Sequence, residues 1–250
     1  MRPAATLALS TMVSLDRSWV IGHRGFSSRS IENTLPSFEA ALAAGARGVE
    51  CDVRATRDGH AVVFHDDSTR RLTGQPGRIE DLTSDQVRAL TFADGHPDVR
   101  IPDLEDVLVL AAERDAIVLI ELKGSPLVFA DLTKAALAAV ERTRTRERIA
   151  FMSFCHSALA DLHDLAPEIP RAPLFDRTPA LEAVLFCQSP FAVFEAGVLT
   201  ERLADGLQAT GVAIGAYGVD DLATDERLDA LGVGLRITDR PDLLVARREK

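Results

Sequence analysis

Short apolar runs alternate with helical patterns along almost the whole chain, and this alternation narrows the choice of folds more than any other feature. The apolar runs predict strands at residues 19–23, 48–53, 61–65, 117–122, 149–153, 191–194, 212–217 and 235–238, with a weaker candidate at 171–174. The intervening patterns predict helices at residues 34–44, 104–114, 129–143, 156–165, 179–186, 200–210, 221–231 and 241–247. Nearly continuous apolar strands are typical of a parallel sheet that is covered on both faces. About eight such strand–helix units in one chain of this length predict an α/β protein with a TIM (β/α)8 barrel.

A doubly wound parallel sheet is the alternative fold. That fold usually carries a glycine-rich phosphate loop directly after its first strand. Here the first strand ends in His23-Arg24-Gly25, so the barrel is favoured. Local signals support the helix boundaries: Thr34 and Thr200 are suited to cap helix starts, and Gly45 is suited to end a helix in the left-handed conformation.

We expect one catalytic domain at residues 19–250, preceded by an N-terminal extension at residues 1–18. No Pro/Gly/Ser-rich linker or change of composition divides the chain. Residues 66–103 do not follow the strand–helix rhythm, and we expect them to form a small excursion that caps the barrel. Within it, the sequence predicts a short strand at 79–83 and a helix at 84–89.

The formal net charge of −10 makes a nucleic-acid ligand improbable, because such ligands are usually held by a general positive field. A phosphorylated ligand would need a metal ion or a few well-placed cations. The three cysteines, Cys51, Cys155 and Cys187, are scattered and form no CxxC pair. This pattern argues against a disulfide framework and against a thiolate zinc site.

No apolar stretch approaches the roughly 20 residues needed to cross a bilayer, so we expect no stable membrane insertion. Residues 4–13 are mildly apolar and follow Arg2, but they contain three hydroxyl residues. We interpret them as part of an extension and expect a cytoplasmic protein. Secretion by a weak N-terminal signal is the alternative. The sequence leaves the oligomeric state open.

The strand at 48–53 carries two carboxylates, Glu50 and Asp52, on the same side, because side chains alternate along a strand. Two carboxylates on one side of an apolar strand repel each other unless a positive group lies between them. Other chemically active side chains stand at or near the ends of predicted strands: His23, His65, Glu121 and Lys123. Active sites of TIM barrels lie at the carboxyl ends of the strands. The sequence therefore predicts one site there.

The residue types indicate a phosphodiester reaction assisted by a metal ion. Glu50, Asp52 and Glu121 would supply hard oxygen ligands suited to Mg²⁺ or Ca²⁺, and the lack of a sulfur or three-histidine set disfavours zinc. Arg24 and Lys123 would bind the phosphate. His23 and His65 would serve as general acid and base for the attacking and leaving oxygens.

Structural explanations compete with these roles. The histidines could be satisfied within the core, and the two carboxylates of the strand could be paired with Arg or Lys inside the barrel. Lys123 could pair only with Glu121, and Arg24 only with Glu32 or Glu50. We interpret the remaining histidines as surface residues: His60, His96, His156 and His163.

The ordered set of motifs resembles the glycerophosphodiester phosphodiesterase family, whose members share a phospholipase C-like TIM barrel. The matching segments are His23-Arg24-Gly25, Glu32-Asn33-Thr34, Phe38, Gly45-Ala46, 49–53, Thr56, Asp58-Gly59, 63–66, 71–73, 101–104, 120–123, Ser153-Phe154 and 237–241. They span residues 20 to 241, which is nearly the whole chain. The combination is specific, although His-Arg-Gly or Glu-Asn-Thr by itself would not be.

The resemblance implies an enzyme that hydrolyses glycerophosphodiesters to sn-glycerol 3-phosphate and an alcohol. It implies His23 and His65 as the acid/base pair and a divalent cation held by Glu50, Asp52 and Glu121. It further implies phosphate contacts from Arg24 and Lys123, an organising role for Glu32, and an excursion that helps to select the substrate. Direct attack by water and formation of a cyclic phosphate both stay open.

Three departures from the family pattern concern the substrate more than the reaction. Ile31 stands where the family usually has proline, and Gly232-Val233-Gly234 lacks a usual aspartate. Tyr217-Gly218-Val219-Asp220 stands where Trp-Thr-Val-Asn is usual. Tyr217 is suited to pack against a glycerol or a head group, while Asp220 would add negative charge near an anionic substrate.

Two other functions compete with this prediction. One is a lysophospholipase D-like or sphingomyelinase D-like activity on acylated lipids, which would need an apolar groove at the site. The excursion offers few large apolar side chains for such a groove: Leu72, Leu82, Val87, Leu90 and Phe92. The other is a non-catalytic barrel that binds a phosphodiester, and it would be favoured by a missing histidine or ligand.

Overall fold

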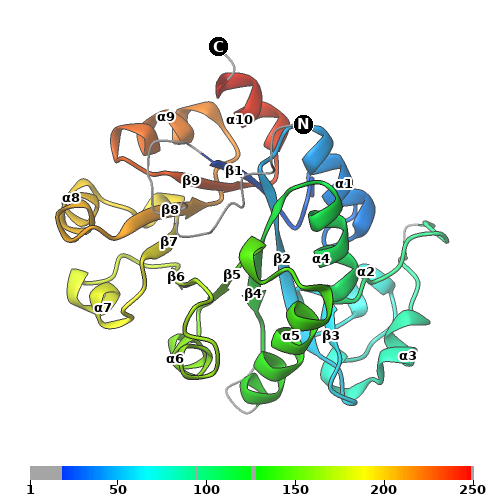
Figure 1. Ribbon diagram of the computed structural model, residues 1–250. Helices are drawn as coiled ribbons and strands as arrows, with labels where there is room; N and C mark the ends of the chain where they lie inside the picture. The colour runs from blue at the N-terminus through cyan, green and yellow to red at the C-terminus, as the bar shows by residue number, and fades with distance from the viewer. Residues whose placement is uncertain (1–18, 94, 125–127, 249–250) are drawn as a thin grey trace, which may run out of the picture.

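The computed structural model describes residues 19–93, 95–124 and 128–248, and the expected extension at residues 1–18 lies outside them. Eight parallel strands form a closed barrel (Figure 1). They are β1 (Trp19–His23), β2 (Gly48–Ala55), β4 (Ile117–Leu122), β5 (Ile149–Ser153), β6 (Arg171–Phe175), β7 (Phe191–Glu195), β8 (Ala213–Tyr217) and β9 (Leu235–Thr238). β1 pairs with β9 on one side and with β2 on the other, and this closes the ring. The predicted TIM barrel is therefore confirmed.

Helices surround the barrel, as Figure 1 shows. They are α1 (Leu35–Ala43), α4 (Leu104–Glu113), α5 (Phe129–Thr143), α6 (His156–Leu165), α7 (Leu181–Phe186), α8 (Glu201–Thr210), α9 (Leu222–Ala230) and α10 (Pro241–Arg248). Every predicted helix is present, with each end within two residues of its expected place. The capping signals are also confirmed. The Thr34 and Thr200 hydroxyls accept hydrogen bonds from the backbone N–H groups of Ser37 and Leu203, and Gly45 has φ +91°.

The strand predicted at residues 61–65 does not belong to the barrel. β3 (Ala61–Val63) pairs antiparallel with the end of β2. The weaker strand candidate at residues 171–174 forms β6, which completes the barrel. A tight turn at Gly59, with φ +79°, reverses the chain after β2. The apolar run alone does not show the strand direction, but the connection does: only residues 56–60, with Asp58-Gly59, separate the two strands, which suits a hairpin and is too short for a parallel crossover. The reversal returns Phe64 to the level of Asp52, whose carbonyl accepts its N–H at 2.9 Å.

The strands bury both of their faces, and their alternation determines which side chains reach the site. On β4, Ile117 and Leu119 pack inside the barrel, while Val118 and Ile120 pack against the helices. The next inward position on this strand is Glu121. On β2, Val49, Cys51 and Val53 face the helices, so that Glu50 and Asp52 turn inward.

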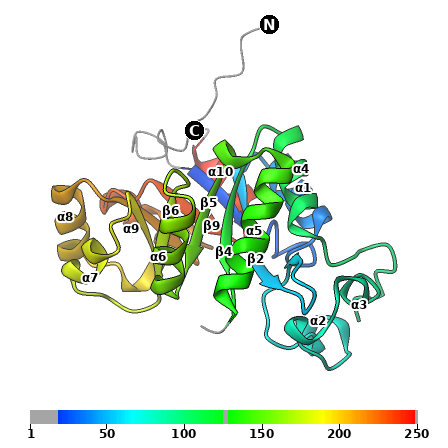
Figure 2. The same ribbon diagram turned by 60° about the horizontal axis from the view of Figure 1, so that its bottom comes forward.

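The excursion forms a small layer to one side of the barrel, next to β2 and β3 (Figure 2). It contains α2 (Arg70–Thr73) and α3 (Ser84–Arg88), the latter as predicted. The strand expected at 79–83 is wrong, because Ile79–Asp81 forms a 3-10 helix whose i+3 hydrogen bonds turn the chain. The five large apolar side chains named above pack into the excursion's own core with Phe64, Ile79 and Ile101.

Candidate active site

A pocket opens at the carboxyl ends of the barrel strands. It is lined by His23, Arg24, Glu50, His65, Glu121, Lys123, Met152, Phe154, Leu174, Tyr217 and Ile237. Seven of the nine predicted site residues are therefore in its wall. The other two lie directly behind it, since Asp52 contacts both Arg24 and Lys123, and Glu32 contacts Arg24. His65 follows β3, which is not a barrel strand. It reaches the pocket because β3 folds back along β2.

Three carboxylates, two in the pocket wall and one behind it, form a compact buried cluster. Glu50, Asp52 and Glu121 are 1%, 0% and 7% exposed, and each offers an oxygen within 4.8 Å of the others. Within the described part of the chain, Glu50 Oε1 is buried without a hydrogen-bond partner. Hard oxygen donors with an unpartnered buried oxygen among them fit a divalent cation such as Mg²⁺ or Ca²⁺.

Electrostatics supports the same conclusion. Burial, reinforced by the charge of Asp52, raises the pKa of Glu50 to about 8 and that of Glu121 to about 7. Burial would also raise the pKa of Asp52, but Lys123 and Arg24 hold it below its ordinary value. The two cations therefore do not neutralise the cluster fully, and an additional positive charge would stabilise it.

Lys123 and Arg24 connect the carboxylates to the pocket. Lys123 Nζ lies 2.6 Å from Glu121 Oε1 and 3.3 Å from Asp52 Oδ1. Arg24 Nε lies 3.1 Å from Asp52 Oδ2, and its Nη1 donates to Glu32 at 2.9 Å. Both cations have the carboxylate partners that a purely structural role would require. Both also line the pocket, where a phosphate would reach them.

Each pocket histidine binds a carboxylate through Nδ1. His23 Nδ1 lies 2.6 Å from Asp239 Oδ1, which also accepts the Ser27 hydroxyl at 2.7 Å. His65 Nδ1 lies 2.7 Å from Asp66 Oδ1. A carboxylate on Nδ1 fixes the orientation of an imidazole and leaves Nε2 for chemistry.

The two histidines have different environments. Burial lowers the pKa of His23, but the hydrogen bond to Asp239 and the charge of Glu50 leave it above its ordinary value. Burial lowers the pKa of His65 below its ordinary value, in spite of Asp52 and Asp66. Opposite shifts of this kind are typical of an acid/base pair.

The loop after β1 carries several site residues in a strained path. Arg24 and Asn33 have φ values of +53° and +57°, which non-glycine residues adopt rarely. This path directs the Arg24 N–H to Glu50 Oε2 at 3.0 Å and the Asn33 amide to Asp52 Oδ2 at 2.8 Å. The conformation is consistent with a functional site, where such strain concentrates.

The remaining pocket wall is mostly apolar. Phe154 and Tyr217 pack edge to face with ring centroids 6.1 Å apart, and Met152, Leu174 and Ile237 continue this wall. The Asp220 carboxylate does not line the pocket. Its Oδ1 accepts hydrogen bonds from the Thr238 hydroxyl and the Asp239 N–H. It therefore supports the residue that orients His23.

A profile of the glycerophosphoryl diester phosphodiesterase family matches residues 23–243. The chain belongs to this family. The family and the enzyme class predicted from the sequence, a phosphoric diester hydrolase, are thereby confirmed.

Similar proteins cover the chain nearly from end to end. A glycerophosphodiester phosphodiesterase from Caldanaerobacter subterraneus subsp. tengcongensis is 31% identical over 239 residues, which are 92% of this chain and 97% of that protein. The crystal structure of a glycerophosphodiester phosphodiesterase from Thermotoga maritima superposes with a TM-score of 0.72 at 30% identity, over 92% of this chain and 97% of the other. An Oleispira antarctica phosphodiesterase in complex with the product sn-glycerol 3-phosphate has the same fold. Its TM-score is 0.88 at 23% identity, over 95% and 99% of the two chains.

Sequence reasoning missed four partners of the predicted residues in this family member: Asn33, Asp66, Arg71 and Asp239. All four lie inside motifs that carry the family resemblance, so their positions were visible. The contact of Asp239 with His23 was not visible, because these residues are 216 apart in the sequence, whereas Asp66 directly follows His65. Phe154 was likewise part of a motif without an assigned contact.

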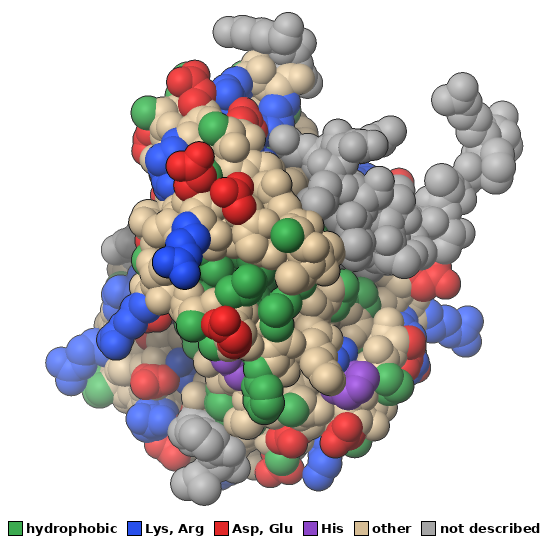
Figure 3. All heavy atoms as spheres, turned by 90° about the vertical axis from the view of Figure 1, so that its left-hand side faces the viewer, with side chains coloured by type: hydrophobic (Ala, Val, Ile, Leu, Met, Phe, Trp, Pro, Cys, Tyr) green, Lys and Arg blue, Asp and Glu red, His purple; other side chains and the backbone are tan. Residues whose placement is uncertain are grey.

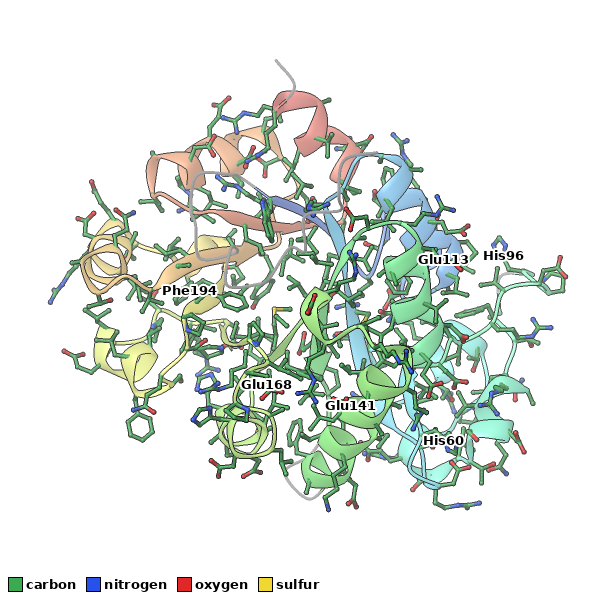
Figure 4. All side chains as sticks on the ribbon, in the orientation of Figure 1. His60, His96, Glu113, Glu141, Glu168 and Phe194 are labelled. Atoms are coloured by element: carbon green, nitrogen blue, oxygen red, sulfur yellow. The ribbon has the colours of Figure 1, made fainter. Side chains whose placement is uncertain are left out.

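The other histidines do not line the pocket. His60 and His96 stand at the periphery of the molecule in Figure 4, and His163 is exposed. These three confirm the surface interpretation. His156 is partly buried instead, with Nε2 3.2 Å from the Leu174 carbonyl and its ring against Phe175.

The surface features bear on possible partners. The face in Figure 3, on the side of α7 and α8, carries acidic and basic side chains intermixed, without a continuous basic area. In the described part of the chain, no helix is both long and apolar enough to span a membrane.

Proposed function

We propose that this family member is a metal-dependent phosphodiesterase that hydrolyses glycerophosphodiesters to sn-glycerol 3-phosphate and an alcohol. The observation that carries the proposal is the arrangement of the two histidines. Both line one pocket with the carboxylate cluster, and each binds a second carboxylate through Nδ1. We further propose that residues 19–250 act as one catalytic domain.

In this proposal Glu50, Asp52 and Glu121 hold Mg²⁺ or Ca²⁺. The ion would supply positive charge that stabilises the phosphoryl oxygens as negative charge develops on them. Arg24 and Lys123 bind other oxygens of the phosphate and orient it between the two histidines. Glu32 organises the site through its ion pair with Arg24.

His23 and His65 transfer the protons. One ring accepts a proton at Nε2 from the attacking oxygen, and the other donates a proton from Nε2 to the leaving alcohol. Asp239 and Asp66 keep the rings oriented through Nδ1 and stabilise the imidazolium that forms. The same pair serves direct attack by water and attack by a glycerol hydroxyl.

Tyr217 and Phe154 form the wall that packs against the glycerol or the head group. The excursion does not extend the apolar wall of the pocket into a groove for an acyl chain, because its apolar side chains are used in its own core. Small water-soluble diesters are therefore favoured over acylated lysolipids.

The test is release of glycerol 3-phosphate from glycerophosphocholine, glycerophosphoethanolamine and glycerophosphoglycerol. We expect release that stops in chelator and returns with Mg²⁺ or Ca²⁺, and the preferred ion identifies the metal. A folded, metal-loaded protein that leaves all three diesters intact would refute the proposal. Turnover of lysophosphatidylcholine would then favour the lipid alternative, and binding without turnover would favour a non-catalytic barrel.

A further inference from the structure

The side chain of Arg71, on α2 in the excursion, donates four hydrogen bonds to two carboxylates. Nε and Nη2 bind Asp66 at 2.5 and 3.0 Å, and Nη1 and Nη2 bind Glu32 at 2.8 and 2.7 Å. We propose that Arg71 is a positioning residue that couples His65 to Arg24, the two pocket residues that these carboxylates hold. The inference rests on the proposed function and deepens it.

One arm of this bridge reaches His65. Asp66 Oδ1 contacts both His65 Nδ1 and Arg71 Nη2. The hydrogen bonds from Arg71 are the main reason that the pKa of Asp66 lies at about 2. Arg71 therefore fixes the rotamer of this carboxylate, so that the His65 ring has one orientation.

The other arm reaches Arg24. Glu32 Oε1 accepts from Arg24 Nη1 at 2.9 Å and from Arg71 Nη2 at 2.7 Å. Burial would raise the pKa of Glu32, but the hydrogen bonds and charges of Arg71 and Arg24 lower it. Glu32 therefore stays charged and holds Arg24 in its place on the pocket wall.

The bridge differs from an ordinary surface ion pair. Exposed pairs are worth roughly 0–1 kcal/mol and often contribute nothing measurable. Arg71 is half exposed, but it binds two carboxylates in the fork geometry that only guanidinium provides, and both acceptors are mostly buried. A lysine at this position would supply one point charge and could not reproduce all four bonds.

The excursion reaches the site by this route and not as a lid. None of its described residues lines the pocket. A second contact acts in the same direction, since the buried Arg54 binds the His65 carbonyl at 2.8 Å and Glu80 of the excursion at 3.3 Å. Through Arg54 and Arg71, the excursion thus fixes the position of His65 without lining the pocket.

The test compares Arg71→Ala and Arg71→Lys with Arg88→Ala. Arg88 is a matched control, because it lies in the same excursion, its side chain is 47% exposed against 48% for Arg71, and it binds Asp85 and Asp103, which do not contact the site. With glycerophosphocholine as substrate, we expect Arg71→Ala to lower kcat by about 10- to 100-fold. KM should rise several-fold because Arg24 is loosened, and Arg71→Lys should recover part of kcat. Arg88→Ala should match the wild type.

A second readout does not depend on turnover. In ¹⁵N-histidine NMR spectra, the His65 ring signals should shift in Arg71→Ala and stay unchanged in Arg88→Ala, with equal thermal unfolding temperatures. An active wild type with equally active Arg71 variants and an unchanged His65 signal would overturn the bridge. An inactive wild type would refute the proposed function instead, while the NMR comparison would still decide the bridge.

Discussion

At the scale of single residues, the site consists of charged groups that hold one another in place. Both histidines are oriented by carboxylates, and both cations are oriented by carboxylates that also face the proposed metal. Such mutual restraint is what a site needs to keep its reacting groups within a fraction of an ångström of their working positions.

The histidine assignment gives a direct prediction. His23→Ala and His65→Ala should each lower turnover by at least about 10²-fold, because each removes one proton-transfer group. Metal affinity, measured by titration calorimetry, should be nearly unchanged, since neither histidine belongs to the carboxylate cluster. His60→Ala is the control, as this ring is exposed and distant from the pocket. Normal turnover in either pocket variant would contradict the assignment.

Residue types and strand positions indicate seven of the nine candidate site residues, and the family resemblance adds Glu32 and Tyr217. The alternation along β2 predicts that Glu50 and Asp52 share a side, and the structure agrees. The alternation cannot reveal Asp239 as the partner of His23, because that contact joins the first and last barrel strands. Asp220 illustrates the same limit: its carboxylate binds the β9 loop and not a substrate position.

At the scale of elements, the connection from β1 to α1 is the most constrained segment. Gly25 has φ +86°, and a Cβ there would lie 2.4–2.7 Å from atoms of Ser37, including its backbone. The loop can place Arg24 over Asp52 only because this glycine lets α1 approach closely.

Gly25→Ala should therefore destabilise the protein much more than Gly59→Ala. Gly59 also has a positive φ, +79°, but a methyl group there would have no atom of the described chain within 4 Å, apart from its own neighbours in sequence. Both variants bear the left-handed strain of roughly 1–2 kcal/mol, and only Gly25→Ala adds a clash of about 1–3 kcal/mol. Urea unfolding of the two variants measures this difference, and equal losses would argue against the close approach.

At the scale of the whole molecule, the barrel buries three carboxylates from two directly paired strands, β2 and β4, in one cluster. Folding forces these charges together, and the raised pKa values of Glu50 and Glu121 record the cost. A cation that binds only the folded state would reverse this cost.

The raised pKa values of Glu50 and Glu121 predict how the free energy of unfolding depends on pH. A carboxyl group whose pKa is raised on folding binds more protons in the folded state, so the free energy of unfolding falls as pH rises. Without metal, we expect stability to decline between about pH 4.5, the ordinary value, and about pH 8, the value for Glu50. Mg²⁺ or Ca²⁺ should stabilise the protein more at pH 8 than at pH 6, because protons compete with the ion at low pH.

Thermal unfolding in chelator and in metal across this range provides the measurement. Glu50→Gln should flatten the pH dependence without metal and weaken the response to the ion. A wild type whose unfolding temperature is unaffected by either ion at every pH would exclude the carboxylate cluster as a metal site.

The sequence by itself determines the barrel and the helix boundaries and indicates the candidate site residues, because periodicity, capping and strand-end positions depend on neighbours along the chain. Only the tertiary structure decides that Asp239 is the partner of His23 and that Arg71 reaches Glu32, because these contacts join segments 216 and 39 residues apart. They depend on which distant segments meet when the chain folds. No local pattern contains that information, since a carboxylate has the same local appearance whichever partner it will contact.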